Sequence, residues 1–475
     1  MIHTIRTNYL SKQRRLLLSM VGWTLFSLSG CDGQVTPEYK DAKLTIDKSI
    51  ELDYLLYLPH NYSSEKAWPL VLYLTGLETA GDITLINQHG PPQAISEGLE
   101  NDFFVLAPQL PGDVHWDAEA LMALLVAIQS NYAIDPGRIY VTGFGDRGGY
   151  GCWDVATSYP GIFSKVAPIS APACTEICRV GDVSIRIYHG KIDQVVPVED
   201  AVNMRFELDY YCKLDVELKV YETLGHQIWD TVYADPEFWM WFTDSPPVQG
   251  VSGKQPLQEH FSTRISREVE DNYLLYLPKQ YSKKESWPLL IFLHGSGSAI
   301  EDIEKIRMGG PPKLFEEGMD SDFILLAPQL HANLPWDVER VFALIQKVSK
   351  EYKVDSTRIY LTGLSRGGFG AWELAVSNPE LFAAVAPIAA RDIPGVERLA
   401  KSNIWIFHGQ DDDGVPWQGS QFMYNRLKHT GANVQLSLLE GIGHNAWDFA
   451  YNSDEFWSWL LSQKNEYSEA GNAVN

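Results

Sequence analysis

The stretch RIYLTGLSRGGFG, residues 358–370, carries the clearest indication of the fold of this chain. It begins as a short apolar run and continues, after Ser365, as a segment that can form a helix. A serine on so sharp a strand-to-helix turn needs small residues two positions before and two after it, and Gly363 and Gly367 stand there. Such a turn presents the hydroxyl at the carboxyl edge of a parallel sheet, beside a helix N-terminus that favours negative charge. The stretch therefore predicts a nucleophile elbow with Ser365 as the nucleophile.

A candidate acid follows the apolar run NIWIFHG, residues 403–409, in the segment QDDDGVP. A similar segment earlier in the chain, HGKIDQVVP, keeps a single aspartate, Asp193, which aligns with Asp412. Asp412 is therefore the predicted orienting acid, and Asp411 and Asp413 are interpreted as solvated loop charges. A calcium site is the alternative interpretation of the three, but consecutive carboxylates point in different directions and do not converge on one ion.

The predicted base is His444, in the segment EGIGHNAWD. It completes the chain order Ser, Asp, His, and a neutral imidazole held by Asp412 can take the serine proton and later protonate the leaving group. His408 is the competing candidate. It ends a strand before the acid, which breaks the expected chain order, so His444 is preferred.

The loop LHGSGS, residues 293–298, follows an early apolar run and is typical of a loop whose backbone N–H groups face a tetrahedral oxyanion. Ser296 or Gly297 would supply one donor, and Arg366, the residue after the nucleophile, would supply the other. His294 is expected to shape this loop.

The chain repeats itself at an offset of 218 to 220 residues, which indicates a tandem duplication of a whole-domain unit. The matching segments include YLLYLP at 54–59 and 273–278, WPLVLYLTG at 68–76 and WPLLIFLHG at 287–295, and DFFVLAPQL at 102–110 and DFILLAPQL at 322–330. Short apolar runs alternate with longer segments of helical spacing, such as residues 336–352. This pattern predicts an α/β architecture in each half, a mostly parallel sheet with helices on both faces.

The predicted organisation has six parts. They are a signal peptide at 1–30, a tether at 31–44, a first half at 45–242, a linker at 243–260, a second half at 261–463 and a disordered tail at 464–475. The linker is predicted from its Pro, Gly, Ser and Gln content, and the tail from its polarity.

The first half carries a related stretch, TGFGDRGGYG at 142–151, which is one residue longer than its counterpart and lacks the serine. If Asp146 takes the serine's place, the residue two positions before it is the bulky Phe144. If Gly145 takes it, the residue two positions after it is Arg147, and there is no nucleophile. Neither register keeps both small neighbours, so the first half is predicted to be catalytically silent.

Other parts of this degenerate site persist. Asp193 and His226 remain, but the loop that corresponds to HGSG ends in Glu78, whose charge would oppose an oxyanion. The retained pair can survive as a structural hydrogen bond. An aspartate nucleophile at Asp146 is the alternative interpretation, because some hydrolases use one.

The N-terminal sequence has the pattern of an export signal. Basic residues precede the apolar run LLLSMVGWTLFSLSG, residues 16–30, which is shorter than the roughly 20 residues that span a bilayer. The run ends at Cys31 in a segment that resembles a bacterial lipobox, which predicts a lipid anchor on that cysteine in an exported, membrane-attached protein. An ordinary cleaved signal and an uncleaved anchor are the alternatives.

The remaining cysteines lie in the first half, at positions 152, 174, 178 and 212, and allow three ways of forming two disulfides. The net charge of -23 and the pI near 4.9 argue against a nucleic-acid or anionic-membrane partner, because binding to either requires clustered basic residues.

Both halves resemble α/β-hydrolases over nearly their whole length. They are similar to the bacterial secreted group labelled predicted peptidases, which is related to polyhydroxybutyrate depolymerase-like and feruloyl-type esterases. The resemblance is carried by WPLLIFLHGSG, GPPKLFEEG, LAPQ, RIYLTGLSRGG and GHNAWD. Arg366 departs from the group, in which Met or Gln is more usual at that position.

The resemblance implies hydrolysis of a carboxylic ester through an acyl-enzyme, without a cofactor or a metal ion. The substrate would be a small or polymer-linked ester. Peptide hydrolysis is the second hypothesis, because the same triad serves both reactions. A lipid-anchored protein that binds without catalysis is the third.

Overall fold

The computed structural model describes most of the chain from residue 37 onward. The described residues are 37–112, 114–174, 176–244, 248–249, 255–298, 302–330 and 334–465. The described residues all belong to one compact unit, Val35–Asn475. The predicted signal peptide, the lipidation site Cys31 and most of the predicted tail lie outside the described residues. Within the described part of the chain, no helix has the length and apolarity needed to cross a membrane.

A 14-stranded sheet joins the two halves of the chain. The strands of the first half are β1 (Glu38–Tyr57), β2 (Trp68–Leu74), β4 (Phe104–Pro108), β5 (Ile134–Phe144), β6 (Lys165–Ile169), β7 (Ser184–Gly190) and β8 (Val216–Tyr221). Those of the second half are β10 (Leu257–Tyr276), β11 (Trp287–Leu293), β12 (Ile324–Pro328), β13 (Val354–Leu364), β14 (Ala384–Ile388), β15 (Asn403–Gly409) and β16 (Asn433–Leu439). The order is β16-β15-β14-β13-β11-β12-β10-β1-β4-β2-β5-β6-β7-β8, so both halves repeat one strand order outward from β1 and β10. A short separate sheet pairs β3 (Leu99–Glu100) with β9 (Val248–Gln249).

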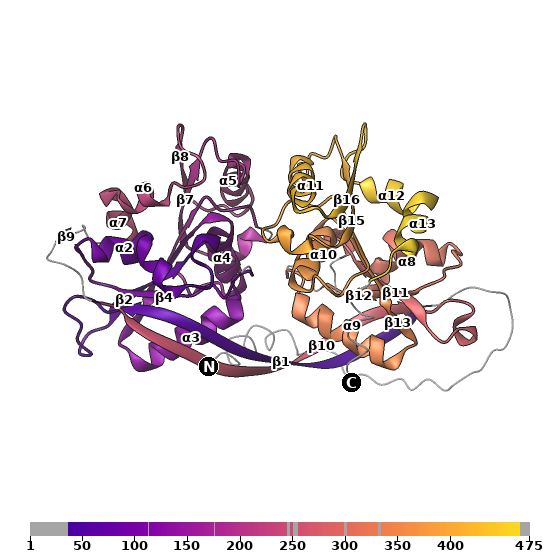
Figure 1. Ribbon diagram of the computed structural model, residues 1–475, viewed down its shortest axis with the longest axis horizontal. Coiled ribbons are helices and arrows are strands. Elements are labelled where there is room, and N and C mark those ends of the chain that lie inside the picture. Colours follow the sequence, from indigo (N-terminus) through magenta and orange to yellow (C-terminus); the bar gives the residue numbers. More distant parts are fainter. Residues whose placement is uncertain are drawn as a thin grey trace. The chain divides into compact units, whose positions relative to one another are not determined.

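Helices cover both faces of the sheet in each half (Figure 1). On one face lie α3 (Ala118–Asn131), α4 (Gly145–Ser158) and α5 (Val198–Phe206), with α9 (Val338–Glu351), α10 (Arg366–Ser377) and α11 (Gln418–Thr430) in the second half. On the other face lie α2 (Gly90–Ser96), α6 (Trp229–Tyr233) and α7 (Pro236–Thr243), with α8 (Gly310–Glu316), α12 (Ala446–Tyr451) and α13 (Asp454–Ser462). Strands such as β11 are buried along their whole length, as expected for parallel strands covered on both sides. The predicted α/β architecture is confirmed.

Strands β1 and β10 form one long antiparallel ribbon, which Figure 1 shows running along both halves. The pairing extends from Glu38 opposite Leu275 to Leu56 opposite Leu257. The predicted tether and linker are therefore wrong in part, because β1 begins at Glu38 and β10 begins at Leu257. The Pro, Gly and Ser residues that indicated a linker all lie before Leu257, and β1 and β10 alternate more and less exposed residues with the period of a strand.

The ribbon exchanges core residues between the halves. Ala42 and Leu44, near the start of β1, pack into the hydrophobic core of the second half. Conversely, Phe261 and Ile265 of β10 pack against the core of the first half. Each half therefore takes part of its core from the first strand of the other half, the second half from β1 and the first half from β10.

This exchange predicts that Leu44→Ala destabilises the folded protein, although Leu44 lies well outside the second half in sequence. Leu44 is 6% exposed, and truncation of a buried leucine typically costs about 2 to 5 kcal/mol. Denaturant unfolding measures the loss. The control is Lys43→Ala, whose side chain is 84% exposed and whose removal should change the free energy of unfolding by less than about 0.5 kcal/mol. Equal stability of the two variants would contradict the exchange.

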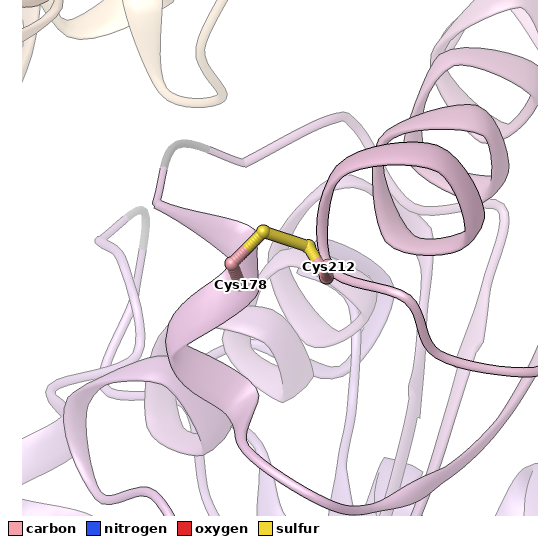
Figure 2. Close-up of a disulfide and its surroundings, with 2 residues drawn as sticks. All are labelled: Cys178 and Cys212. Atoms are coloured by element: carbon pink, nitrogen blue, oxygen red, sulfur yellow. A yellow bond between two sulfur atoms is a disulfide. The ribbon is translucent and has the colours of Figure 1, made fainter.

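One disulfide forms, between Cys178 and Cys212 (Figure 2). It ties the 3-10 helix η3 (Ile177–Val180) to the end of the π-helix η4 (Glu207–Tyr211). Cys152 and Cys174 are buried free thiols, so a second disulfide, which the even count allowed, is absent from the described residues.

Candidate active site

The turn at Ser365 has the backbone of a nucleophile elbow. Ser365 lies between β13 and α10 with φ of 54° and ψ of −123°, a conformation that costs energy for a residue with a side chain. A Cβ on Gly363 would lie 2.1 Å from the carbonyl oxygen of Gly367, and one on Gly367 would lie 1.8 Å from that of Leu293. No side chain fits at either position, which is why the elbow requires both glycines.

The structure brings Ser365, Asp412 and His444 together at the carboxyl ends of three strands, β13, β15 and β16. The Ser365 hydroxyl donates to Nε2 of His444 across 2.9 Å, and Nδ1 of His444 donates to Oδ2 of Asp412 across 2.7 Å. With the ring proton on Nδ1, Nε2 is placed to accept the serine proton.

Asp412 is held as a carboxylate. Its Oδ1 accepts hydrogen bonds from the backbone N–H groups of Gly414, at 3.0 Å, and Val415, at 2.8 Å. Burial alone would raise its pKa, but hydrogen bonds from His408, His444 and the backbone outweigh burial and hold the pKa of Asp412 well below its usual range. Asp412 is buried while Asp411 and Asp413 are exposed, and the described residues contain no cluster of three such side chains arranged to hold a metal ion.

His408, the competing candidate base, supports the loop that carries the acid. It is fully buried, with Nε2 at 2.9 Å from the carbonyl oxygen of Val415 and Nδ1 at 2.7 Å from the hydroxyl of Ser420. Its Nε2 also lies 3.3 Å from Oδ2 of Asp412. Nε2 is thus engaged with the loop that follows β15, and Nδ1 with the first turn of α11.

The predicted oxyanion loop passes directly beside the nucleophile. A Cβ on Gly295 would lie 3.3 Å from Cβ of Ser365, and the next residue, Ser296, begins the short helix η6 (Ser296–Ser298). His294 fixes this loop, because its Nδ1 donates to the carbonyl oxygen of Gly295 and its Nε2 accepts from the N–H of Leu330, each at 2.9 Å. The loop is therefore held in place by a neutral, buried imidazole.

The neutrality of His294 makes the stability of the fold depend on pH. Burial, with a contribution from the nearby charge of Arg366, lowers the pKa of His294 from 6.5 to about 4. As pH falls from 6.5 to 4, the unfolded chain takes up this proton before the folded chain does, so the free energy of unfolding falls. A shift of this size corresponds to roughly 3 kcal/mol. In His294→Gln, whose amide does not titrate, denaturant unfolding at pH 7 and pH 4.5 should show a smaller loss than in the wild type. An equal loss would contradict the shift.

In the first half, Gly145 occupies the position of the nucleophile. Its φ is 71°, and a Cβ on it would lie 3.5 Å from Nε2 of His226. Nδ1 of His226 in turn lies 2.8 Å from Oδ2 of Asp193. The acid and the base are in place, and the hydroxyl is missing.

The prediction that the first-half elbow loses its small neighbours is wrong. A Cβ on Gly143 would lie 2.5 Å, and one on Gly148 2.2 Å, from the carbonyl oxygen of Leu74, which repeats the tight packing of the second half. The inserted residue, Asp146, is taken up in the first turn of α4, so the turn itself survives.

Asp146 does not replace the serine. Its Oδ2 accepts from the guanidinium of Arg147 at 2.7 Å and lies 3.6 Å from that of Arg426. The carboxylate that lies near the vacant position belongs to Glu78, whose Oε1 would be 3.9 Å from a Cβ on Gly145. Burial raises the pKa of Glu78 above its usual value.

One residue at the site had no signal in the sequence. Glu176, from the first half, forms an ion pair with Arg366, the residue after the nucleophile. The pair joins positions 190 residues apart that share no motif, so sequence reasoning could not find it.

Comparison with known proteins finds a family match within the second half. Residues 259–472 match the dienelactone hydrolase family. The chain is 25% identical over 207 residues to the poly(3-hydroxyoctanoate) depolymerase of Pseudomonas fluorescens, covering 37% of this chain and 73% of that protein. It is 27% identical over 173 residues to a probable feruloyl esterase C of Aspergillus clavatus, covering 35% of this chain and 63% of that protein.

The solved structures that match have low TM-scores. A thermostable esterase matches with a TM-score of 0.38 and 26% identity, covering 46% of this chain and 69% of that one. Est1E from Butyrivibrio proteoclasticus matches with a TM-score of 0.32 and 18% identity, covering 41% of this chain and 96% of that one. Residues 259–472 are thus similar to the dienelactone hydrolase family, and the protein is a carboxylic ester hydrolase of the α/β-hydrolase fold.

Proposed function

We propose that Ser365, Asp412 and His444 hydrolyse carboxylic esters through an acyl-enzyme. The observation that carries this proposal is the position of His444, which hydrogen-bonds the serine hydroxyl at 2.9 Å and the aspartate at 2.7 Å. A nucleophile, its base and the acid that orients the base are thus within hydrogen-bond reach without any rearrangement.

In the proposed reaction, the Ser365 oxygen attacks the ester carbonyl while its proton moves to Nε2 of His444. Asp412 stabilises the imidazolium that forms, and the backbone N–H groups of Ser296 or Gly297 and of Arg366 stabilise the oxyanion. His444 then protonates the departing alkoxide, which leaves an acyl group on Ser365. A water molecule, deprotonated by His444, cleaves that ester and regenerates the serine.

The first half is proposed to be catalytically inactive and to derive from a tandem duplication. Its elbow carries Gly145, which has no side chain to act as a nucleophile, and Glu78 brings a carboxylate near the place where negative charge would develop. The two halves share their strand order and their paired His and Asp, which supports a common origin.

The proposed substrates are polymer-linked or small esters of hydroxy acids or aromatic acids. The relatives named above are a polyester depolymerase and feruloyl esterases, which supports this class. The test is a panel of p-nitrophenyl acetate, methyl ferulate, a hydroxyalkanoate oligomer and a peptide p-nitroanilide on the purified mature protein. Ester turnover without peptide cleavage supports the proposal. Peptide cleavage without ester turnover would instead make the protein a peptidase.

We also propose that the protein is exported and anchored to a bacterial membrane by a lipid on Cys31. The disulfide between Cys178 and Cys212 supports an oxidising compartment outside the cytosol. The lipobox-like segment at residues 28–31 supports the anchor itself.

A further inference from the structure

The guanidinium of Arg366 is paired with a carboxylate from the other half of the chain. Glu176, at the start of η3 in the first half, contacts Nη2 of Arg366 at the start of α10. The two side chains are 15% and 17% exposed, so the pair is shielded from solvent more than a surface ion pair is. The first half thereby reaches the residue that directly follows the nucleophile.

Arg147, the arginine of the first half that corresponds to Arg366, pairs with a carboxylate from its own half. Arg147 stands where Arg366 stands in the second half, and its own neighbour Asp146 supplies the carboxylate. Arg366 has no acidic neighbour in its turn, where Ser365 and Gly367 flank it. The carboxylate for Arg366 therefore comes from Glu176.

The backbone conformation at Glu176 is unfavourable for a residue with a side chain, which indicates that the carboxylate has a role there. Glu176 has φ of 58°, a left-handed conformation that favours glycine, and the residue at the same place in the second half is Gly395, with φ of 80°. A side chain there costs roughly 1 kcal/mol of backbone energy. The first half keeps a glutamate where the same turn could be made more easily with glycine.

The segment that carries Glu176 is held firmly on both sides. The disulfide between Cys178 and Cys212 fixes η3 two residues further on (Figure 2). On the other side, Arg391 of the second half donates to the carbonyl oxygen of Cys174 at 3.4 Å. Glu176 therefore lies between two contacts, the disulfide at Cys178 and the hydrogen bond at Cys174.

We infer that Glu176 is a positioning residue for the active site of the second half. It turns the Arg366 side chain toward the first half and neutralises its charge, which fixes the first turn of α10 and the Arg366 N–H that faces the oxyanion. The first half, although it lacks a nucleophile, thus completes the site. This inference rests on the proposed function of Ser365.

Loss of the carboxylate should change catalysis in a way that a structural contact would not. In Glu176→Gln, kcat for p-nitrophenyl acetate should fall about 5- to 20-fold with KM nearly unchanged, because the affected N–H acts in the transition state. The freed guanidinium should lower KM for an ester that carries a carboxylate, such as mono-4-nitrophenyl succinate, by about 3-fold relative to the neutral ester. Glu176→Asp should recover most of the lost kcat.

Glu207→Gln is the matched control. Glu207 also belongs to the first half and pairs with an arginine of the second half, Arg391, but that arginine does not adjoin the nucleophile. This variant should keep kcat within about 2-fold of the wild type and leave the preference between the two esters unchanged. The inference is overturned if Glu176→Gln matches the wild type, if Glu207→Gln reproduces its kinetics, or if Glu176→Asp recovers nothing.

The rate at which a neutral fluorophosphonate labels Ser365 separates this inference from the proposed function. A labelled wild type with slower labelling in Glu176→Gln supports both. A labelled wild type with unchanged labelling and kinetics in Glu176→Gln overturns the role of Glu176 alone. A wild type that neither reacts nor turns over any ester overturns the proposed function, and the role of Glu176 with it.

Discussion

Ser365→Ala is expected to lower kcat/KM for p-nitrophenyl acetate by at least about 10⁴-fold, because it removes the atom that forms the acyl-enzyme. The change is otherwise mild. Alanine has the same Cβ as serine and meets the same backbone cost at φ of 54°, and the N–H of residue 365 can still donate to the carbonyl oxygen of Ile388. The elbow should therefore stay folded, and the thermal midpoint should stay close to that of the wild type.

A control in the first half distinguishes the two elbows. Asp146→Asn removes the carboxylate that could act as an alternative nucleophile and keeps its size. Because that carboxylate is bound to Arg147 and Gly145 occupies the serine's place, this variant should retain the turnover of the wild type. Activity that survives Ser365→Ala and is lost in Asp146→Asn would move catalysis to the first half.

Asp412→Asn should give the second largest loss, about 10³- to 10⁴-fold in kcat. An asparagine can keep the bonds from Gly414 and Val415 through its Oδ1, so the loop should hold its shape. Its amide, however, would face Nδ1 of His444 with a donor in place of an acceptor. The imidazole would then take the wrong tautomer, or lose the charge that stabilises it when protonated, and KM should change little.

The neighbouring aspartates provide the control for this variant. Asp411→Asn and Asp413→Asn alter exposed loop charges by the same chemistry and should leave kcat within about 2-fold of the wild type. Asp193→Asn, at the same place in the first half, should also leave ester turnover unchanged. If Asp413→Asn lost as much activity as Asp412→Asn, the orienting acid would be misassigned.

The site of the second half could be predicted from sequence because its requirements are local. The glycines around Ser365 are forced by clashes of about 2 Å with backbone oxygens, and those clashes leave a fixed spacing in the sequence. The chain order of acid and base follows from the order of parallel strands, whose carboxyl ends meet at one edge of the sheet. The choice of Asp412 among three aspartates came from comparison with the other half.

The first-half elbow was misjudged because sequence spacing is not backbone geometry. An insertion between Gly143 and Gly148 looked incompatible with the turn, but the first turn of α4 absorbs the extra residue and both glycines keep their packing. The long pairing of β1 with β10 and the contact between Glu176 and Arg366 join distant segments. The contact between Glu176 and Arg366 leaves no local pattern, and the alternation along β1 and β10 does not tell which strand each one pairs with.

Ser365 is proposed to be the one working nucleophile of the chain. The most direct test is to treat the wild-type protein with a fluorophosphonate and to locate the adduct by peptide mass mapping, with Ser365→Ala beside it. One adduct per chain is expected, on the peptide that contains residues 359–366, and none is expected in the variant. An adduct on a residue of the first half, or an unlabelled Ser365 in a protein that still hydrolyses esters, would contradict the account.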